Sequence, residues 1–134
     1  MTPAVRWSAD ARTDDAAACI EEAVDLGHFD HYAQLVDELS LLLGRHGLGQ
    51  TLAYLLMRGG GRESSPYELV YRQVTRRLAQ LYPLSNDDLL THLTRVDSKQ
   101  YLRLAEETRL FALTLYAELD ALEDAAYEDD QEIP

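Results

Sequence analysis

Apolar residues recur at intervals of three and four along almost the whole chain, and no stretch alternates apolar and polar residues over the length of a strand. This period is that of an amphipathic helix, and the residues that interrupt it are the helix-ending Gly and Pro. A helix with one apolar face must bury that face against other helices. The sequence therefore predicts an all-α protein, a compact bundle of about five to six helices with a long C-terminal helix.

Two helices are predicted in the first third of the chain. The first covers residues 13–27 and ends at Gly27, a residue suited to the position just past a helix C-terminus. Asp30 could cap the second helix, which ends at Gly44 or one turn later at Gly47. The apolar stripe of this second helix consists of Tyr32, Leu35, Val36, Leu39, Leu42 and Leu43.

The middle of the chain holds the clearest helix boundary. The eight residues after Gln50 are almost wholly apolar, so we expect a central helix that is buried on most of its sides. Three consecutive glycines end it, and a capping box with Pro66 at the first helical position opens the next helix, which stops before Pro83. The markers are Gly59-Gly60-Gly61 for the loop, Ser65-Pro66-Tyr67-Glu68 for the capping box, and Ser85 or Asn86 to about Arg95 for a short following helix.

The longest predicted helix is capped by Asp97 or Ser98 and runs to about Asp124. One apolar row along it predicts a seam that packs on the rest of the bundle. A second row is either buried in the chain's own core, which we expect, or offers an apolar face to a partner. The seam is Tyr101, Leu104, Thr108, Phe111, Leu115, Leu119 and Leu122, and the second row is Leu102, Leu110, Leu113 and Tyr116.

These helices fit one helical domain over residues 1–122, with about 12 N-terminal residues that can be disordered. Residues 123–134 are acidic and unperiodic, which predicts a disordered tail. No run of eighteen apolar residues occurs, which argues against a membrane. The first twenty residues lack the pattern of a signal peptide and the single cysteine cannot form an internal disulfide, so we expect a cytoplasmic protein.

Motifs for cofactor binding are incomplete in this chain. Gly47 and Gly49 lack the third glycine of a dinucleotide-binding loop, and no strand precedes them. The loop after Gly59 lacks the Gly-Lys-Ser/Thr of a phosphate-binding loop. His28 and His31 are separated from a shared helix face by the Gly27 break, so surface histidines are favoured over a metal site. We expect no cofactor and no metal.

Catalytic constellations are also weak. Cys19 lies in an apolar helix stripe, where a small buried side chain is commoner than a nucleophile. Paired carboxylates occur at predicted helix starts, where the helix dipole accounts for them without acid–base chemistry. These pairs are Asp14-Asp15 and Asp87-Asp88. We expect no catalytic residues and no enzymatic activity.

The net charge of −12 hides an uneven distribution. Residues 1–43 hold 2 basic and 9 acidic side chains, whereas residues 110–134 hold 8 acidic side chains and no basic one. Residues 44–109 hold 10 basic and 7 acidic side chains, a net charge of +3. The overall charge argues against a nucleic-acid partner, but local surface charge decides phosphate binding.

The cations of the middle segment fall into rows. Arg72 and Arg76 lie four residues apart with Arg77 adjacent, and Arg95, Lys99 and Arg103 form a ladder with the same spacing. Such rows can follow a phosphate backbone. From composition alone, the favoured interpretation is instead a solvated helix face whose cations pair with nearby carboxylates.

One segment resembles a known family. The stretch His46-Gly47-Leu48-Gly49-Gln50-Thr51-Leu52-Ala53-Tyr54-Leu55 is similar to the Asn-Gly-Leu-Gly-Gln-Thr-Leu-Ala-Phe-Leu motif of the small helical subunit of type III-B CRISPR effector complexes, the Cmr small subunit. The resemblance covers residues 16–122 and is most specific in the Gly-Leu-Gly-Gln core. Flanking features that also fit are Tyr32 and the stripe that follows it, Asp97-Ser98, Tyr101 and Thr108-Arg109.

The resemblance implies a non-catalytic all-α subunit that stacks head to tail along large backbone subunits and helps hold guide RNA and target RNA. Its partners would be those subunits, neighbouring copies of itself and the RNA, with no membrane. Gln50 and Thr51 would shape the end of the central helix or a subunit contact, beside Gly47, Leu48 and Gly49 of the same motif. The cations that would face RNA phosphates are Arg45, Arg72, Arg76, Arg77, Arg95, Lys99 and Arg103.

One departure from the family concerns the last helix. The family commonly ends it with an aromatic and basic Trp-Leu-Lys-Arg-Phe-Ala cluster, where this chain reads Tyr116-Ala117-Glu118-Leu119-Asp120-Ala121. Because the basic pair is acidic here, this region is expected to meet an Arg-rich protein neighbour or solvent. The alternative function is a free-standing helical adaptor that forms homo-oligomers through its long last helix and does not touch RNA.

Overall fold

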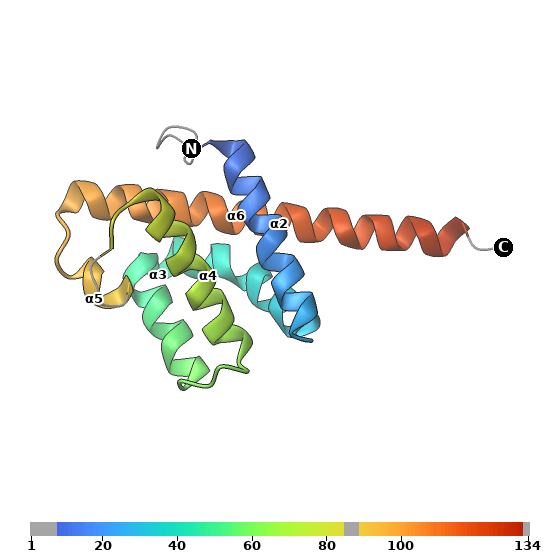
Figure 1. Ribbon diagram of the computed structural model, residues 1–134, viewed down its shortest axis with the longest axis horizontal. Coiled ribbons are helices and arrows are strands. Elements are labelled where there is room, and N and C mark those ends of the chain that lie inside the picture. The colour runs from blue at the N-terminus through green and yellow to red at the C-terminus, as the bar shows by residue number, and fades with distance from the viewer. Residues whose placement is uncertain (1–7, 85–88, 133–134) are drawn as a thin grey trace.

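The computed structural model describes residues 8–84 and 89–132, with side chains placed through residue 126. These residues form five helices and no strand, so the predicted all-α fold with a long C-terminal helix is confirmed. Figure 1 shows their arrangement. The helices are α2 (Ala9–Asp25), α3 (Phe29–Gly59), α4 (Pro66–Leu81), α5 (Leu89–Leu93) and α6 (Ser98–Glu132).

Helix α6 is the axis of the molecule. Helices α2 and α3 both pack on it, and α4 packs mainly on α3. The last part of α6 extends beyond the other helices, so its two ends lie at opposite ends of the longest dimension (Figure 1). The core lies between α6 and the α3–α4 pair, and α2 closes it with Ala16, Cys19, Ile20 and Ala23.

The first two helices start differently from the sequence prediction. The Ser8 side chain accepts a hydrogen bond from the Ala11 N–H at 3.1 Å, so α2 begins four residues before residue 13. Residues 9–12 are therefore helical, whereas residues 1–7 lie outside the described residues. Asp30 is not the cap of α3: the helix begins at Phe29 without a side-chain cap, and Asp30 lies in its first turn.

A kink at Gly47 divides α3 into two helical stretches. Gly47 has φ 78° and ψ 175°, a backbone region that is essentially restricted to glycine. The second stretch buries Leu48, Leu52 and Leu55, but Met57 is 72% exposed. The expectation of burial on most sides is therefore wrong, because Gln50, Ala53 and Met57 of this stretch are exposed.

The boundaries of α4 confirm the prediction for that helix. The Ser65 side chain accepts a hydrogen bond from the Tyr67 N–H at 3.2 Å, and Pro66 occupies the first turn. The helix ends at Leu81, before Pro83. Helix α5 matches the predicted short helix, whose expected start at Ser85 or Asn86 lies outside the described residues.

Helix α6 has one buried and one exposed row. Asp97 caps it, because its Oδ1 accepts a hydrogen bond from the Gln100 N–H at 2.8 Å. Most of the predicted seam is buried, but the second row is not: Leu102 is 66%, Leu113 43% and Tyr116 48% exposed. The expected burial of that row is therefore wrong. Buried seam residues are Leu104, Thr108, Phe111, Leu115 and Leu119, while Tyr101 is half-buried and Leu122 exposed.

The backbone of α6 continues to Glu132, past the predicted end near Asp124. Residues 123–132 thus differ from the disordered tail expected from their lack of periodicity. Ala and Glu are favourable helix residues, and no Gly or Pro interrupts the chain before Pro134, so the helix has no local signal to stop.

We predict that Gly47→Ala lowers the free energy of unfolding by about 1–3 kcal/mol, because alanine is strained at this φ and ψ. The matched control is Gly44→Ala, which lies in regular helix with no atom near the added Cβ. That change should be neutral or raise stability by up to about 1 kcal/mol. Urea unfolding followed by circular dichroism compares the two, and equal stability of the two variants would contradict the prediction.

Candidate nucleic-acid interface

The Gly47–Thr51 motif forms the joint between α3 and α6. Because a new helical stretch starts after the kink at Gly47, its first N–H groups have no partner within the helix. The Tyr101 hydroxyl accepts one of them, from Gly49, at 3.1 Å. Tyr101 stands in the first turn of α6, directly after the Asp97 cap. The motif and the Asp97–Tyr101 segment are therefore two halves of one contact.

The other motif residues divide between the core and the surface. Leu48 and Thr51 are buried, and the Thr51 hydroxyl oxygen has no hydrogen-bond partner among the described residues. Gln50 is exposed. Inside the molecule the motif is structural, and Gln50 is the polar motif side chain that a neighbouring subunit can reach.

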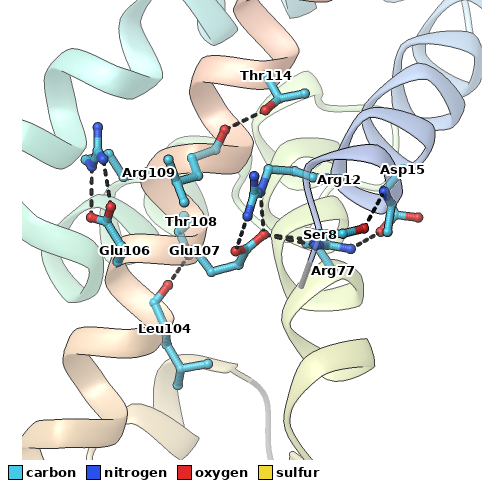
Figure 2. A network of polar contacts seen from close by, with 12 residues as sticks. Ser8, Arg12, Asp15, Arg77, Leu104, Glu106, Glu107, Thr108, Arg109 and Thr114 are labelled. Atoms are coloured by element: carbon cyan, nitrogen blue, oxygen red, sulfur yellow. Dashed lines mark hydrogen bonds and ion pairs between the residues drawn. The ribbon is translucent and has the colours of Figure 1, made fainter. Parts of the chain in front are cut away.

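Arg77 is in the core and does not face solvent. Its side chain is 2% exposed and lies 3.0 Å from a Glu107 oxygen and 2.5 Å from Asp15 (Figure 2). Arg12 bonds the two Glu107 oxygens at 2.8 and 2.9 Å. The expectation that Arg77 contacts RNA is therefore wrong, because a phosphate cannot reach it without opening the bundle. The helix dipole, to which the sequence analysis attributed Asp15, is not its only role, because Asp15 also forms an ion pair with Arg77.

The row on α4 faces the carboxylates of α2. The Arg76 guanidinium lies 2.6 Å from Glu22 and, with a hydrogen bond from Gln73, lowers the pKa of that carboxyl below its usual value despite partial burial. Arg72 lines a hollow together with Glu21, Glu22 and Asp25. Both exposed cations of this row therefore stand beside negative charge.

Lys99 and Arg103 form a different kind of surface, which we call the cationic ridge. Both are exposed, and they lie four residues apart on one side of α6. On one flank is a hollow of about 420 Å³ lined by Leu102 and Leu110. On the other is a hollow of about 220 Å³ lined by Tyr82 and other residues. Both cations line both hollows.

Two carboxylates that line the larger hollow beside the ridge also contact other arginines. Glu106 lies 2.7 Å from Arg109, which lowers the pKa of that carboxyl, and Glu107 belongs to the buried cluster with Arg12 and Arg77. Asp97, the cap of α6, lines the smaller hollow beside both cations. The predicted ladder is shorter than expected, because Arg95 lies in the turn before α6. Arg45 is exposed on α3, two residues before Gly47.

Two polar residues that sequence reasoning missed join the helices inside the bundle. Arg12 carries no local signal, since its partner Glu107 is 95 residues away. Gln73 is buried; it accepts a hydrogen bond from the Tyr32 hydroxyl at 2.7 Å and donates one to the Cys19 carbonyl at 3.0 Å. Both join helices that lie far apart in the sequence, and only the fold identifies them.

The residues considered for catalysis and metal binding do not form such sites in the described part of the chain. Cys19 is buried, and burial raises the pKa of its thiol to about 11. Among residues 8–84 and 89–132, no three or more His, Cys, Asp or Glu side chains are placed to hold a metal ion. Asp87-Asp88 lies outside those ranges. In the same part of the chain, no helix is both long and apolar enough to span a membrane.

Comparison with known proteins identifies a family. The chain matches the family model described as CRISPR-associated protein (Cas_Cmr5) over residues 8–116, from the cap of α2 to the exposed Tyr116 of α6. The match includes the Gly47–Thr51 motif, the Tyr101 contact and the cationic ridge. No curated protein and no solved structure matches the chain.

We predict that Glu107→Gln destabilises the fold by about 3–5 kcal/mol, because it leaves the buried cations Arg12 and Arg77 without their shared charge. The control is the same change at the preceding residue. Glu106→Gln removes only an exposed contact to Arg109 and should leave the stability nearly unchanged. Chemical denaturation measures both; similar losses would show that the buried cluster does not hold the helices together.

We also predict that Cys19 resists alkylation. At pH 8 its reaction with iodoacetamide should be at least about 100-fold slower than that of an exposed thiol, because burial and the raised pKa leave little thiolate. In denaturant the rate should become ordinary. Rapid labelling of the folded chain, read by mass spectrometry, would contradict this placement.

Proposed function

Because the chain belongs to the Cas_Cmr5 family, the small helical subunit of type III-B Cmr complexes, we propose that it stacks with neighbouring copies along the large backbone subunits and helps hold guide RNA and target RNA. Membership implies association with other Cmr subunits and a structural, non-catalytic part in the complex.

The cationic ridge is the observation that supports an RNA contact. Lys99 and Arg103 are exposed and lie four residues apart on one side of α6. Two such cations can contact successive phosphates without reading the bases. Arg45, Arg72 and Arg95 are further candidate contacts, each exposed.

The strength of this contact follows from its size. Two phosphate contacts give a salt dependence of about 1.4 in log affinity per log salt for single strands, far less than proteins that bind RNA alone. The acidic remainder of the chain weakens binding further. We therefore expect RNA to be held by several copies in an assembly rather than by one free chain.

The adaptor alternative has one observation in its favour. Leu102, Leu113 and Tyr116 are exposed on α6 and can form a self-contact. An adaptor of this kind predicts a homo-oligomer that is insensitive to salt and copurifies with neither RNA nor Cmr subunits. The family match favours the first proposal, because it supplies the partners that the adaptor lacks.

The experiment is copurification of the tagged chain from its host. We expect the other effector subunits and guide RNA to be recovered with it. Reversal of the ridge by Lys99→Glu with Arg103→Glu should lower the recovered RNA per complex at least about threefold while subunit recovery stays the same. Recovery of neither RNA nor subunits would contradict the proposal as a whole.

A matched control separates local charge from total charge. Arg58→Glu with Arg62→Glu makes the same change in net charge at the last turn of α3 and the loop that follows it, on exposed residues away from the ridge. This variant should retain RNA. If both double variants lose RNA equally, the ridge is not the contact and only the total charge matters.

A further inference from the structure

A polar pocket lies between the first turns of α3, the end of the same helix and the start of α4. Its volume is about 550 Å³, within the range of pockets that bind small molecules. His31 and Arg58 both line it, although a straight helix would place them about 40 Å apart at 1.5 Å per residue. The kink at Gly47 therefore brings the two stretches of α3 to one pocket.

One side of the pocket is cationic. Arg58 and Arg62 line it, and both side chains are exposed. The Arg58 guanidinium carbon lies 5.2 Å from the centroid of the Tyr67 ring, and Arg62 donates a hydrogen bond to the Gly59 carbonyl at 3.4 Å. In the described part of the chain neither arginine forms an ion pair with a carboxylate, so both can take an anion from outside.

Hydroxyl groups lie beside these cations. Ser64 and Ser65 line the same pocket. The Ser65 oxygen accepts a hydrogen bond from the Tyr67 N–H at 3.2 Å, which leaves its own O–H as a donor. Glu68 of the first turn of α4 does not line the pocket, because its carboxylate packs against Gly59. Two guanidinium groups and two hydroxyls together suit a phosphate group.

The first turns of α3 form the other side, where the groups accept hydrogen bonds. Gln34 and Glu38 lie four residues apart on one face of the helix, and Leu35 lies between them. A lone phosphate gains nothing from Glu38, which repels it. The pocket therefore suits a ligand with a phosphate at one end and hydroxyl groups at the other, with a part that can pack against Leu35 and Pro66.

We propose that this pocket binds a free ribonucleoside monophosphate. Its phosphate lies between Arg58 and Arg62, and Glu38 accepts hydrogen bonds from both ribose hydroxyls, a contact that acidic residues make in dinucleotide-binding folds. The loop after Gly59 lacks the phosphate-binding loop motif, and arginine side chains take the place of its lysine and backbone N–H groups.

The ribose distinguishes a free nucleotide from the phosphorylated 5′ end of an RNA strand. A free monophosphate offers both hydroxyls to Glu38, whereas the 5′ nucleotide of a strand has its 3′ oxygen in a phosphodiester. The inference goes beyond the RNA contact of the cationic ridge and does not depend on it. Reversal of Arg58 and Arg62 accordingly leaves RNA in the complex.

Isothermal titration calorimetry of the full chain with adenosine monophosphate tests the pocket. We expect one site with a Kd below about 1 mM, and at least about tenfold weaker binding of adenosine and of inorganic phosphate, because each lacks part of the contacts. The 2′-deoxy analogue and a short RNA with a 5′ phosphate should each bind at least about threefold more weakly than adenosine monophosphate.

Single substitutions locate the site. Arg58→Gln and Arg62→Gln should each weaken binding of adenosine monophosphate at least about fivefold. The matched control is Arg109→Gln, which removes one charge from an exposed arginine of α6 and should leave binding unchanged. Glu38→Ala should weaken binding of the nucleotide but not of inorganic phosphate. All four side chains are exposed, so circular dichroism of each variant should match the unsubstituted chain.

The outcomes separate this inference from the proposed function. No saturable binding, equal losses in Arg58→Gln and Arg109→Gln, or phosphate binding as tight as nucleotide binding would each overturn it. Binding of the 5′-phosphorylated RNA as tightly as the nucleotide would overturn the free nucleotide as the occupant. Loss or retention of RNA after reversal of the ridge tests only the proposed function and leaves the pocket unaffected.

Discussion

The fold depends on a cluster of charges that three helices bury together. Glu107 of α6 receives Arg12 from α2 and Arg77 from α4, and Arg77 also reaches Asp15 of α2. Two cations and two carboxylates balance, which lets the arginine side chains span a core that apolar residues alone would fill less specifically. Because buried charges are tolerated only when paired, this cluster fixes how α2 crosses α6 and α4.

The family motif shapes the backbone of α3. Gly47 turns the chain, and the turn exposes N–H groups that a regular helix would satisfy; Tyr101 accepts one of them at Gly49. The contact ties the kink of α3 to the start of α6. The first turns of α6 carry the cationic ridge, so the motif helps set where Lys99 and Arg103 lie.

Features that depend on residues close together in the sequence can be predicted from the sequence alone. The cap at Asp97, the start of α4 at Pro66 and the buried seam of α6 are local patterns, and the structure confirms them. The burial of the Arg77 side chain, in contrast, depends on carboxylates that are 30 and 62 residues away in the sequence. In the same way, periodicity shows that α6 has a second apolar row, but only the position of the other helices decides whether that row is covered.

The same limit applies to the charge distribution of this acidic chain. The middle segment of the sequence has a net charge of +3. However, Arg76 and Arg77 form ion pairs with carboxylates of α2, and α2 lies in the acidic first third of the sequence. Folding thus forms ion pairs between segments whose net charges have opposite signs. What remains on α6 is a small cationic surface at one end and an acidic surface at the other. A surface of that size gains useful affinity only by repetition, so the proposed RNA contact depends on the proposed stacking of copies.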